Sequence, residues 1–392
     1  MSGPAVVEYA VAVRPRYRAA GRQEKKRILD EFCDTTGMHR KAVIRLLNRP
    51  AGPKKRVGGR PRRYGPEVAE ALVKVWEAGD RMCGKLLAAV MANLVEALER
   101  HGELVVTPEV RALLLKISPS SIDRIVSRHR RRLSLQPQRK RAAPSGLKGE
   151  VPVRTWSEWK EAPVGSLQAD LVLHCGESTE GFYLSSLCAI DVASGWIELQ
   201  PIWGTGAQRV GSGVHHIRQR LPFTLRSLHT DNGAEFINHT LYNWCRREKV
   251  SFTRGRSYRK NDQAYVEQRN WLAVRRQVGY DRLASKQALA LLEELYPLLC
   301  LHLNFLRPLR KVVAKERVGA RVVKRYDEPR TPFQRLLASG VLSDEDRVRL
   351  AAKLRSTNPL ELRRRIDRLL QQLWNLGTQE RTQAKGEAGA QA

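Results

Sequence analysis

Three apolar runs separated by glycine-containing turns decide the fold of this chain: LQADLVLHCG (167–176), GFYLSSLCAIDVASG (181–195) and WIELQPI (196–202). Short runs of this composition predict three consecutive antiparallel strands. We then expect, in order, a helix over 207–221, a strand in LRSLHTDNG (225–233), a helix over 238–249, a strand in VSFTRG (250–255) and a helix over 262–279. The order βββαβαβα predicts an α/β domain.

Three acidic residues lie within or next to the predicted strands and the last predicted helix. Asp170 lies within the first predicted strand, Asp231 at the end of the fourth, and Glu267 in the last helix. The stretch 151–200 has seven acidic and two basic residues, in a chain whose formal charge is +30. Local acid in a basic protein indicates either divalent-metal ligands or a solvated acidic face, and composition alone leaves both open.

The strings around these acids are QAD (168–170), HTDNGAEF (229–236) and NDQAYVEQRN (261–270), and 35 residues lie between Asp231 and Glu267. In strings, spacing and element order the chain resembles the DDE transposases and integrases of the retroviral integrase core superfamily. The resemblance covers roughly residues 160–282 and is greatest to bacterial insertion-sequence (ISNCY-like) transposases. It implies a ribonuclease-H-like core with a mixed five-stranded sheet flanked by helices.

The resemblance also implies the site. Asp170, Asp231 and Glu267 would be the catalytic residues and would bind two Mg²⁺ ions, for which Mn²⁺ can substitute. Carboxylates are the hard ligands that such a pair needs, and two ions about 3.5–4 Å apart can activate the nucleophile and stabilise the leaving oxygen. Gln263 shares a helical face with Glu267 and would contact DNA. Relatives often carry a Lys where this chain has Trp271.

Other residues near the three acids are not expected to bind metal. The family pattern gives Asp191 and Glu235 no metal role, and a solvated or capping role is expected for Glu235. Gly233 is expected to permit a positive φ at a tight strand exit. The loop before the last helix carries Arg254, Arg256, Arg259 and Lys260, which could grip phosphates or simply be solvated.

The basic excess indicates a polyanionic partner, and double-stranded DNA is the first candidate. Residues 1–150 hold 32 basic and 15 acidic residues. Two helix-turn-helix patterns occur there, one exposing Arg40, Lys41 and Arg45 and the other exposing Arg124 and Arg128. Between them GRPR, with Arg60 and Arg62, is similar to an AT-hook. Plain solvated helices and a flexible basic linker are the alternatives.

The C-terminal region combines helix and strand patterns. An apolar helix covers 284–308, and KVVAKERVGARVVKRYDEP (311–329) predicts a β-hairpin or small barrel around Gly319. A further helix begins at the cap Asn358 and is expected to end at Gly377.

The predicted domains are these: a helix-turn-helix domain (1–51), an AT-hook-like linker (52–65), a second helical DNA-binding domain (66–135), a linker (136–155), the integrase-like catalytic core (156–282), a C-terminal DNA-binding and assembly region (283–377) and a disordered tail (378–392).

The remaining composition restricts the class of protein. Six cysteines without C-x-x-C or zinc-ligand spacing argue against a disulfide framework and a structural zinc site. The sequence shows no secretory signal and no run of about 18 apolar residues, so a bacterial cytoplasmic, nucleoid-associated protein without membrane contact is expected.

Together these features predict a transposase that binds terminal inverted repeats and performs metal-dependent strand cleavage and transfer. Its partners would be transposon ends, target DNA and further copies of itself, because two ends must be brought together. Two alternatives remain: a catalytically inactive, domesticated DNA-binding regulator, which should have lost a carboxylate, and a ribonuclease-H-like nuclease.

Overall fold

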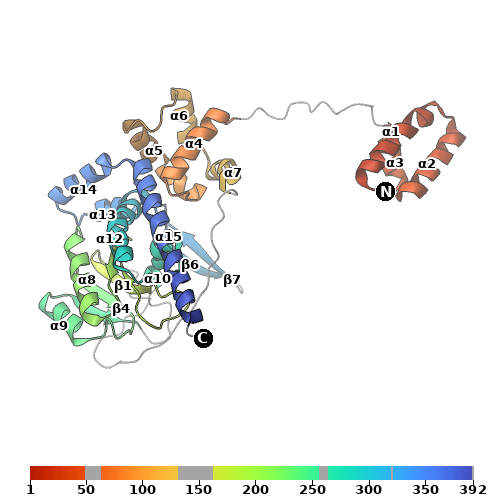
Figure 1. Ribbon diagram of the computed structural model, residues 1–392. Coiled ribbons are helices and arrows are strands. Elements are labelled where there is room, and N and C mark those ends of the chain that lie inside the picture. Colours follow the sequence, from red (N-terminus) through yellow and green to blue (C-terminus); the bar gives the residue numbers. More distant parts are fainter. Residues whose placement is uncertain (49–62, 131–161, 256–263, 319–320, 391–392) are drawn as a thin grey trace. The chain divides into compact units, whose positions relative to one another are not determined.

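The computed structural model describes residues 1–48, 63–130, 162–255, 264–318 and 321–390. The chain forms two compact units, Met1–Arg63 and Tyr64–Ala392 (Figure 1). Each unit has its own apolar core, and each is described by itself below.

The first unit is a cluster of three helices, α1 (Gly3–Ala19), α2 (Arg22–Thr36) and α3 (Arg40–Asn48). The predicted pair of helices joined by a short turn is present as α2 and α3, and Gly37, in the left-handed region at φ 69°, ends α2. Phe32 and Val43 are fully buried between the helices. Helix α1 was not predicted, because its apolar residues are spread around the helix instead of forming one stripe.

Four helices open the second unit: α4 (Pro66–Ala78), α5 (Gly84–Arg100), α6 (Pro108–Leu115) and α7 (Pro119–Arg130). Ile122 and Val126 of α7 are fully buried. Helices α5 and α7 touch at Gly84, where a Cβ atom would lie 2.2 Å from the carbonyl oxygen of Pro119. Asp123 on α7 accepts the Gly84 backbone N–H at 3.0 Å and so caps α5.

The predicted mixed five-stranded sheet is confirmed, with order β3-β2-β1-β4-β5. Strands β1, β2 and β3 are antiparallel neighbours, whereas β4 runs parallel to β1 and β5 parallel to β4. The strands are β1 (Ser166–Leu173), β2 (Ser185–Asp191), β3 (Ile197–Ile202), β4 (Ser227–Thr230) and β5 (Ser251–Arg254). This order and these directions agree with a ribonuclease-H-like core.

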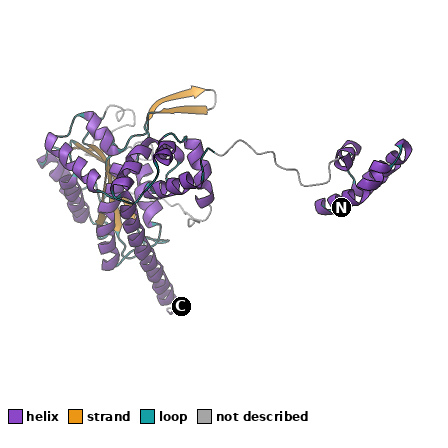
Figure 2. Cartoon of the chain, turned by 90° about the horizontal axis from the view of Figure 1, so that it is seen from above, coloured by secondary structure: helices purple, strands orange, loops and turns teal. Residues whose placement is uncertain are grey.

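Helices cover the sheet (Figures 1 and 2). Helices α8 and α12 pack against β3, and α10 packs against β1 and β2. They are α8 (Ala207–Arg220), α9 (His239–Arg247), α10 (Ala264–Arg269), its π-helical continuation η3 (Asn270–Arg275), α11 (Arg276–Val278), α12 (Lys286–Leu301) and the π-helical turn η4 (His302–Leu306).

The C-terminal region contains the predicted hairpin, β6 (Val312–Val318) and β7 (Arg321–Tyr326), followed by α13 (Pro332–Ser339), α14 (Asp344–Ser356) and α15 (Pro359–Ala390). Figure 2 shows the hairpin projecting from the helices of the second unit. Asn358 caps α15 as predicted, since its Oδ1 accepts the N–H groups of Leu360 and Glu361.

The expected end of this last helix at Gly377 was wrong. Helix α15 continues to Ala390. Gly377 has a packing role, because a Cβ there would lie 3.1 Å from the Cβ of Asp281. The residues beyond it are rich in Ala, Gln, Glu, Lys and Arg, which favour helix.

One helical stretch of the described chain, Lys286–Leu306, is long and apolar enough to cross a membrane, with a mean hydropathy of 1.4. In the fold it is a core helix. Leu292, Leu295 and Tyr296 are fully buried within the second unit.

A buried carboxylate joins the four opening helices to the rest of the second unit. Asp80, in the turn after α4, accepts hydrogen bonds from Arg276 at 3.2 Å, Arg307 at 3.1 Å and Arg363 at 2.9 Å. These arginines come from α11, the end of η4 and α15. Burial alone would raise the pKa of Asp80, but the nearby positive charges, Arg363 first among them, lower it.

We expect Asp80→Asn to destabilise the protein by about 3–5 kcal/mol, because it leaves buried guanidinium groups without their anion. Urea unfolding at neutral pH measures this loss, and Asp344→Asn, at a fully exposed carboxylate of α14, is the matched control. Since the pKa of Asp80 is lowered in the folded state, its contribution is complete above the ordinary aspartate pKa of about 4 and disappears as the pH falls below it. A difference between Asp80→Asn and wild type that grows in acid would contradict this assignment.

Candidate active site

Strand register places two of the predicted catalytic residues side by side. In the parallel pair β1–β4, Ser166 is opposite Ser227 and Gln168 is opposite His229. Continuing this register by two residues sets Asp170 opposite Asp231, which directly follows β4. Adjacent strands lie about 4.8 Å apart, so the two carboxylates share one small region of the sheet.

Asp170 is held in this position by two hydrogen bonds. Its Oδ1 accepts the backbone N–H of Leu171 at 2.9 Å, and its Oδ2 accepts Nδ2 of Asn270 at 2.6 Å. Burial raises the pKa of Asp170 to about 7, and the negative charges of Asp231 and Glu267 add to the rise. The three predicted acids therefore act on one another electrostatically.

The loop after β4 fixes Asp231. The Gly233 N–H donates to Asp231 Oδ1 at 3.0 Å, and Asn232 Nδ2 donates to the Gly255 carbonyl at 3.0 Å. The expected positive φ at Gly233 was wrong, since Gly233 is absent from the positive-φ glycines of the described chain. A Cβ atom there would lie 2.5 Å from the carboxylate of Glu235, so a larger residue would require that side chain to move.

The helix that carries Glu267 is tied to β1 on both sides of that residue. Gln168 Oε1 accepts the Val266 N–H at 3.3 Å, and Asn270 reaches Asp170 from the next turn. Glu267 itself is exposed. Sequence reasoning missed Asn270, although its position three residues after Glu267 puts it on the same helical face.

The donor chemistry of the site fits a hard divalent cation. Asp170 and Asp231 offer carboxylate oxygens, and mutual repulsion of this kind is relieved when a cation binds between such groups. Among the described residues no group of three His, Cys, Asp or Glu side chains is close enough to enclose a metal ion. Asp170 and Asp231 would thus hold the cation, and Glu267 would reach it from the helix.

The predicted DNA-binding residues fall into three groups. Lys41, Arg45 and Arg124 are exposed on helices α3 and α7. Arg40 forms an ion pair with Asp30, and Arg254 is buried and donates to Asn232 Oδ1 at 2.9 Å, so it supports the loop of Asp231. The remaining candidates lie outside the described residues or have undescribed side chains: Arg60, Arg62, Arg128, Arg256, Arg259, Lys260 and Gln263.

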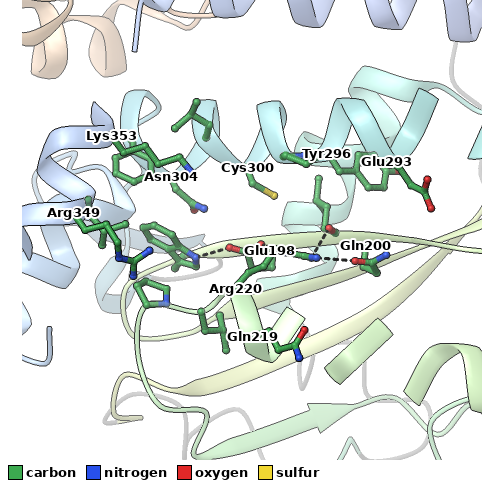
Figure 3. Close-up of a pocket in the computed structure, with 18 of the residues that line it drawn as sticks. Glu198, Gln200, Gln219, Arg220, Glu293, Tyr296, Cys300, Asn304, Arg349 and Lys353 are labelled. Atoms are coloured by element: carbon green, nitrogen blue, oxygen red, sulfur yellow. Dashed lines mark hydrogen bonds and ion pairs between the residues drawn. The ribbon is translucent and has the colours of Figure 1, made fainter. Parts of the chain in front are cut away.

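A cavity of about 490 Å³ lies apart from these acids, between β3, α12 and α14 (Figure 3). At its centre Glu198 accepts hydrogen bonds from Trp196 Nε1 and Arg220 Nε, both at 3.0 Å. The amide of Asn304 bonds both the N–H and the carbonyl of Ile197. These groups satisfy one another, and they block the outer edge of β3 from pairing with another strand.

Comparison with known proteins identifies relatives of the chain. No family model matches it. The uncharacterized protein y4rM of Sinorhizobium fredii (strain NBRC 101917 / NGR234) is 41% identical over 329 residues, which are 84% of this chain and 94% of that protein. The chain belongs to the family of y4rM. Among solved structures, it is similar to the catalytic core domain of BIV integrase, with 22% identity, a TM-score of 0.29, and coverage of 45% of this chain and 95% of that one.

We expect Asp170→Asn to lower the affinity for Mn²⁺ by at least about tenfold, because it removes a ligand charge at nearly constant shape. Isothermal titration of the full-length protein measures this affinity. Glu316→Gln, on the exposed hairpin, is the control and should bind Mn²⁺ as wild type does. Equal Mn²⁺ affinity in wild type and Asp170→Asn would show that the metal does not bind here.

Proposed function

We propose that this protein is a DDE polynucleotidyl transferase that cuts and joins DNA strands as the transposase of an insertion sequence. The observation that carries the proposal is the parallel register of β1 and β4, which, continued by two residues beyond the paired segment, brings Asp170 beside Asp231. The helix of Glu267 is tied across the same strand by Gln168 and Asn270. Carboxylates gathered at one place on a sheet suit phosphodiester chemistry in a basic protein.

Each part of the site has a role in this proposal. Two Mg²⁺ ions, or Mn²⁺ in their place, would supply Lewis-acid activation of the attacking oxygen and charge stabilisation at phosphorus. Asp170, Asp231 and Glu267 hold them. Gly233, Leu171 and Asn270 keep the two aspartates in fixed orientation by donating hydrogen bonds to them.

The basic surfaces would bind the DNA. Lys41 and Arg45 are exposed on α3 of the first unit, and Arg124 is exposed on α7 of the second. Lys324 and Arg325 are exposed on the hairpin. Double-stranded DNA, both transposon ends and target, is the partner proposed for these groups, and bringing two ends together requires a homo-oligomer.

A test with two oligonucleotides separates a transposase from a nuclease. In transposition, the 3′-hydroxyl freed by cleavage is the nucleophile of the joining step. We therefore expect a precleaved duplex from the DNA that borders the gene to become covalently joined to a plasmid in Mg²⁺ or Mn²⁺. The same duplex with a 3′-deoxy terminus should not be joined, and Glu267→Gln should join neither. Equal nicking of the plasmid with either duplex, without joined product, would favour the nuclease.

A second test concerns the first unit. Because Asp80 bonds the helices of 66–130 to distant parts of the second unit, the fragment to express alone is Met1–Arg63. It should bind DNA with an affinity that falls roughly 10- to 100-fold between about 50 and 200 mM salt, as about two to four phosphate contacts require. Gel-shift titration of the fragment measures it.

The matched variants of this fragment carry equal changes of charge on different helices. Lys41→Glu with Arg45→Glu, on α3, should abolish the shift. Arg22→Glu with Lys26→Glu, exposed on α2, should weaken it much less. Equal losses in both pairs would contradict a recognition role for α3.

A further inference from the structure

Asn270 has one satisfied and one unsatisfied side-chain atom at the centre of the site. Its Nδ2 donates to Asp170 Oδ2 at 2.6 Å, whereas its Oδ1 is buried and has no hydrogen-bond partner. The residue as a whole is only 9% exposed. A buried acceptor without a partner is unfavourable in the free protein, which points to a partner that arrives with the substrate.

The orientation of this amide follows from chemistry. A carboxylate that holds a metal ion is ionised and only accepts hydrogen bonds, so in the metal-bound site the group of Asn270 that faces Asp170 is the NH₂ donor. The carbonyl oxygen Oδ1 of the same planar amide then lies next to Asp170 without bonding to it. The π-helical turn η3 begins at Asn270, and such turns within α-helices are frequent at functional sites.

Few groups can donate a hydrogen bond to Oδ1 of Asn270. Oδ1 can only accept, so its partner must carry a donated hydrogen. Phosphate oxygens of DNA are acceptors. The base amines of a duplex keep one N–H that pairing does not use, but these groups face the grooves and not the backbone. Two donors remain that would lie beside Asp170 during the reaction. They are the terminal 3′-hydroxyl of the DNA and the water that attacks in hydrolysis.

From this we propose that Asn270 is a fourth polar residue of the active site, whose Oδ1 accepts a hydrogen bond from the attacking O–H group. The inference rests on the proposed function and deepens it. Asn270 holds Asp170 with its amide hydrogens and orients the nucleophile with its oxygen. One side chain thereby sets the geometry between the carboxylate and the attacking atom.

Binding measurements on the full-length protein test the inference under conditions in which no DNA strand is cut or joined. The probes are the precleaved bordering duplex with a 3′-hydroxyl and the same duplex with a 3′-deoxy end, in Ca²⁺ so that no strand is joined. Wild type should bind the 3′-hydroxyl end roughly three- to tenfold more tightly, as one neutral hydrogen bond provides. Asn270→Leu, which has a similar shape without an acceptor, should bind both ends equally.

Two further variants serve as controls for the binding preference. Asn375→Leu makes the same chemical change at an exposed position of α15 and should keep the wild-type preference. Asn270→Asp keeps an acceptor oxygen but loses the donor to Asp170, so it should also keep the preference. A thermal melt of each variant shows that it is folded. Asn270→Ala, which also lacks the acceptor and should bind both ends equally, carries the test if Asn270→Leu does not fold.

The outcomes distinguish the source of the O–H group. If wild type has no 3′-hydroxyl preference but Asn270→Leu hydrolyses an intact end at least about tenfold more slowly with unchanged Kd, the donor is water. If neither the preference nor the hydrolysis rate depends on Asn270, the inference is overturned while strand joining by wild type still supports the proposed function. Failure of wild type to join strands at all overturns both.

Discussion

The constraint on which the second unit depends is the parallel register that sets Asp170 opposite Asp231. Two ionised carboxylates at the spacing of adjacent strands, about 4.8 Å, repel each other by about 3 kcal/mol at an effective dielectric constant of about 20. The fold opposes this repulsion with neutral donors from Leu171, Gly233 and Asn270. Among the described residues no cationic side chain bonds either acid, so the pair is suited to an external cation.

The helix of Glu267 is anchored along its whole length by groups remote in sequence. Gln168 accepts the N–H of Val266 near its start, Asp170 accepts from Asn270 in its middle, and Asp80 accepts from Arg276 at its end. The last of these anchors belongs to the helices that open the second unit. Those helices therefore contribute to the position of the active-site helix, whatever DNA contacts they make.

The local sequence pattern was sufficient to predict most of the fold and to propose part of the candidate site. The strands around Asp170 and Asp231 were predictable because each is a short apolar run between turns. The catalytic role of the acids stays a prediction that rests on the resemblance of their strings and spacing to a known superfamily. Asn270 and Asp80 were not predictable, since their partners lie 100 and up to 283 residues away. Gly233 was assigned the wrong reason, because only the folded loop shows that the Glu235 carboxylate lies against it.

The net charge of +30 overstates the basic surface that is available for DNA. Several arginines are used inside the second unit. Arg307 and Arg363 are buried on Asp80, and Arg254 is buried against Asn232. A buried guanidinium holds the fold together through fixed hydrogen bonds and adds little to the attraction of a phosphate outside. Among the described residues, exposed cations such as those on α3, α7 and the hairpin are left to attract DNA. Within the described part of the chain, a basic protein can in this way keep a pair of carboxylates that no bonded cation neutralises, because the arginines named here are neutralised or used inside the fold.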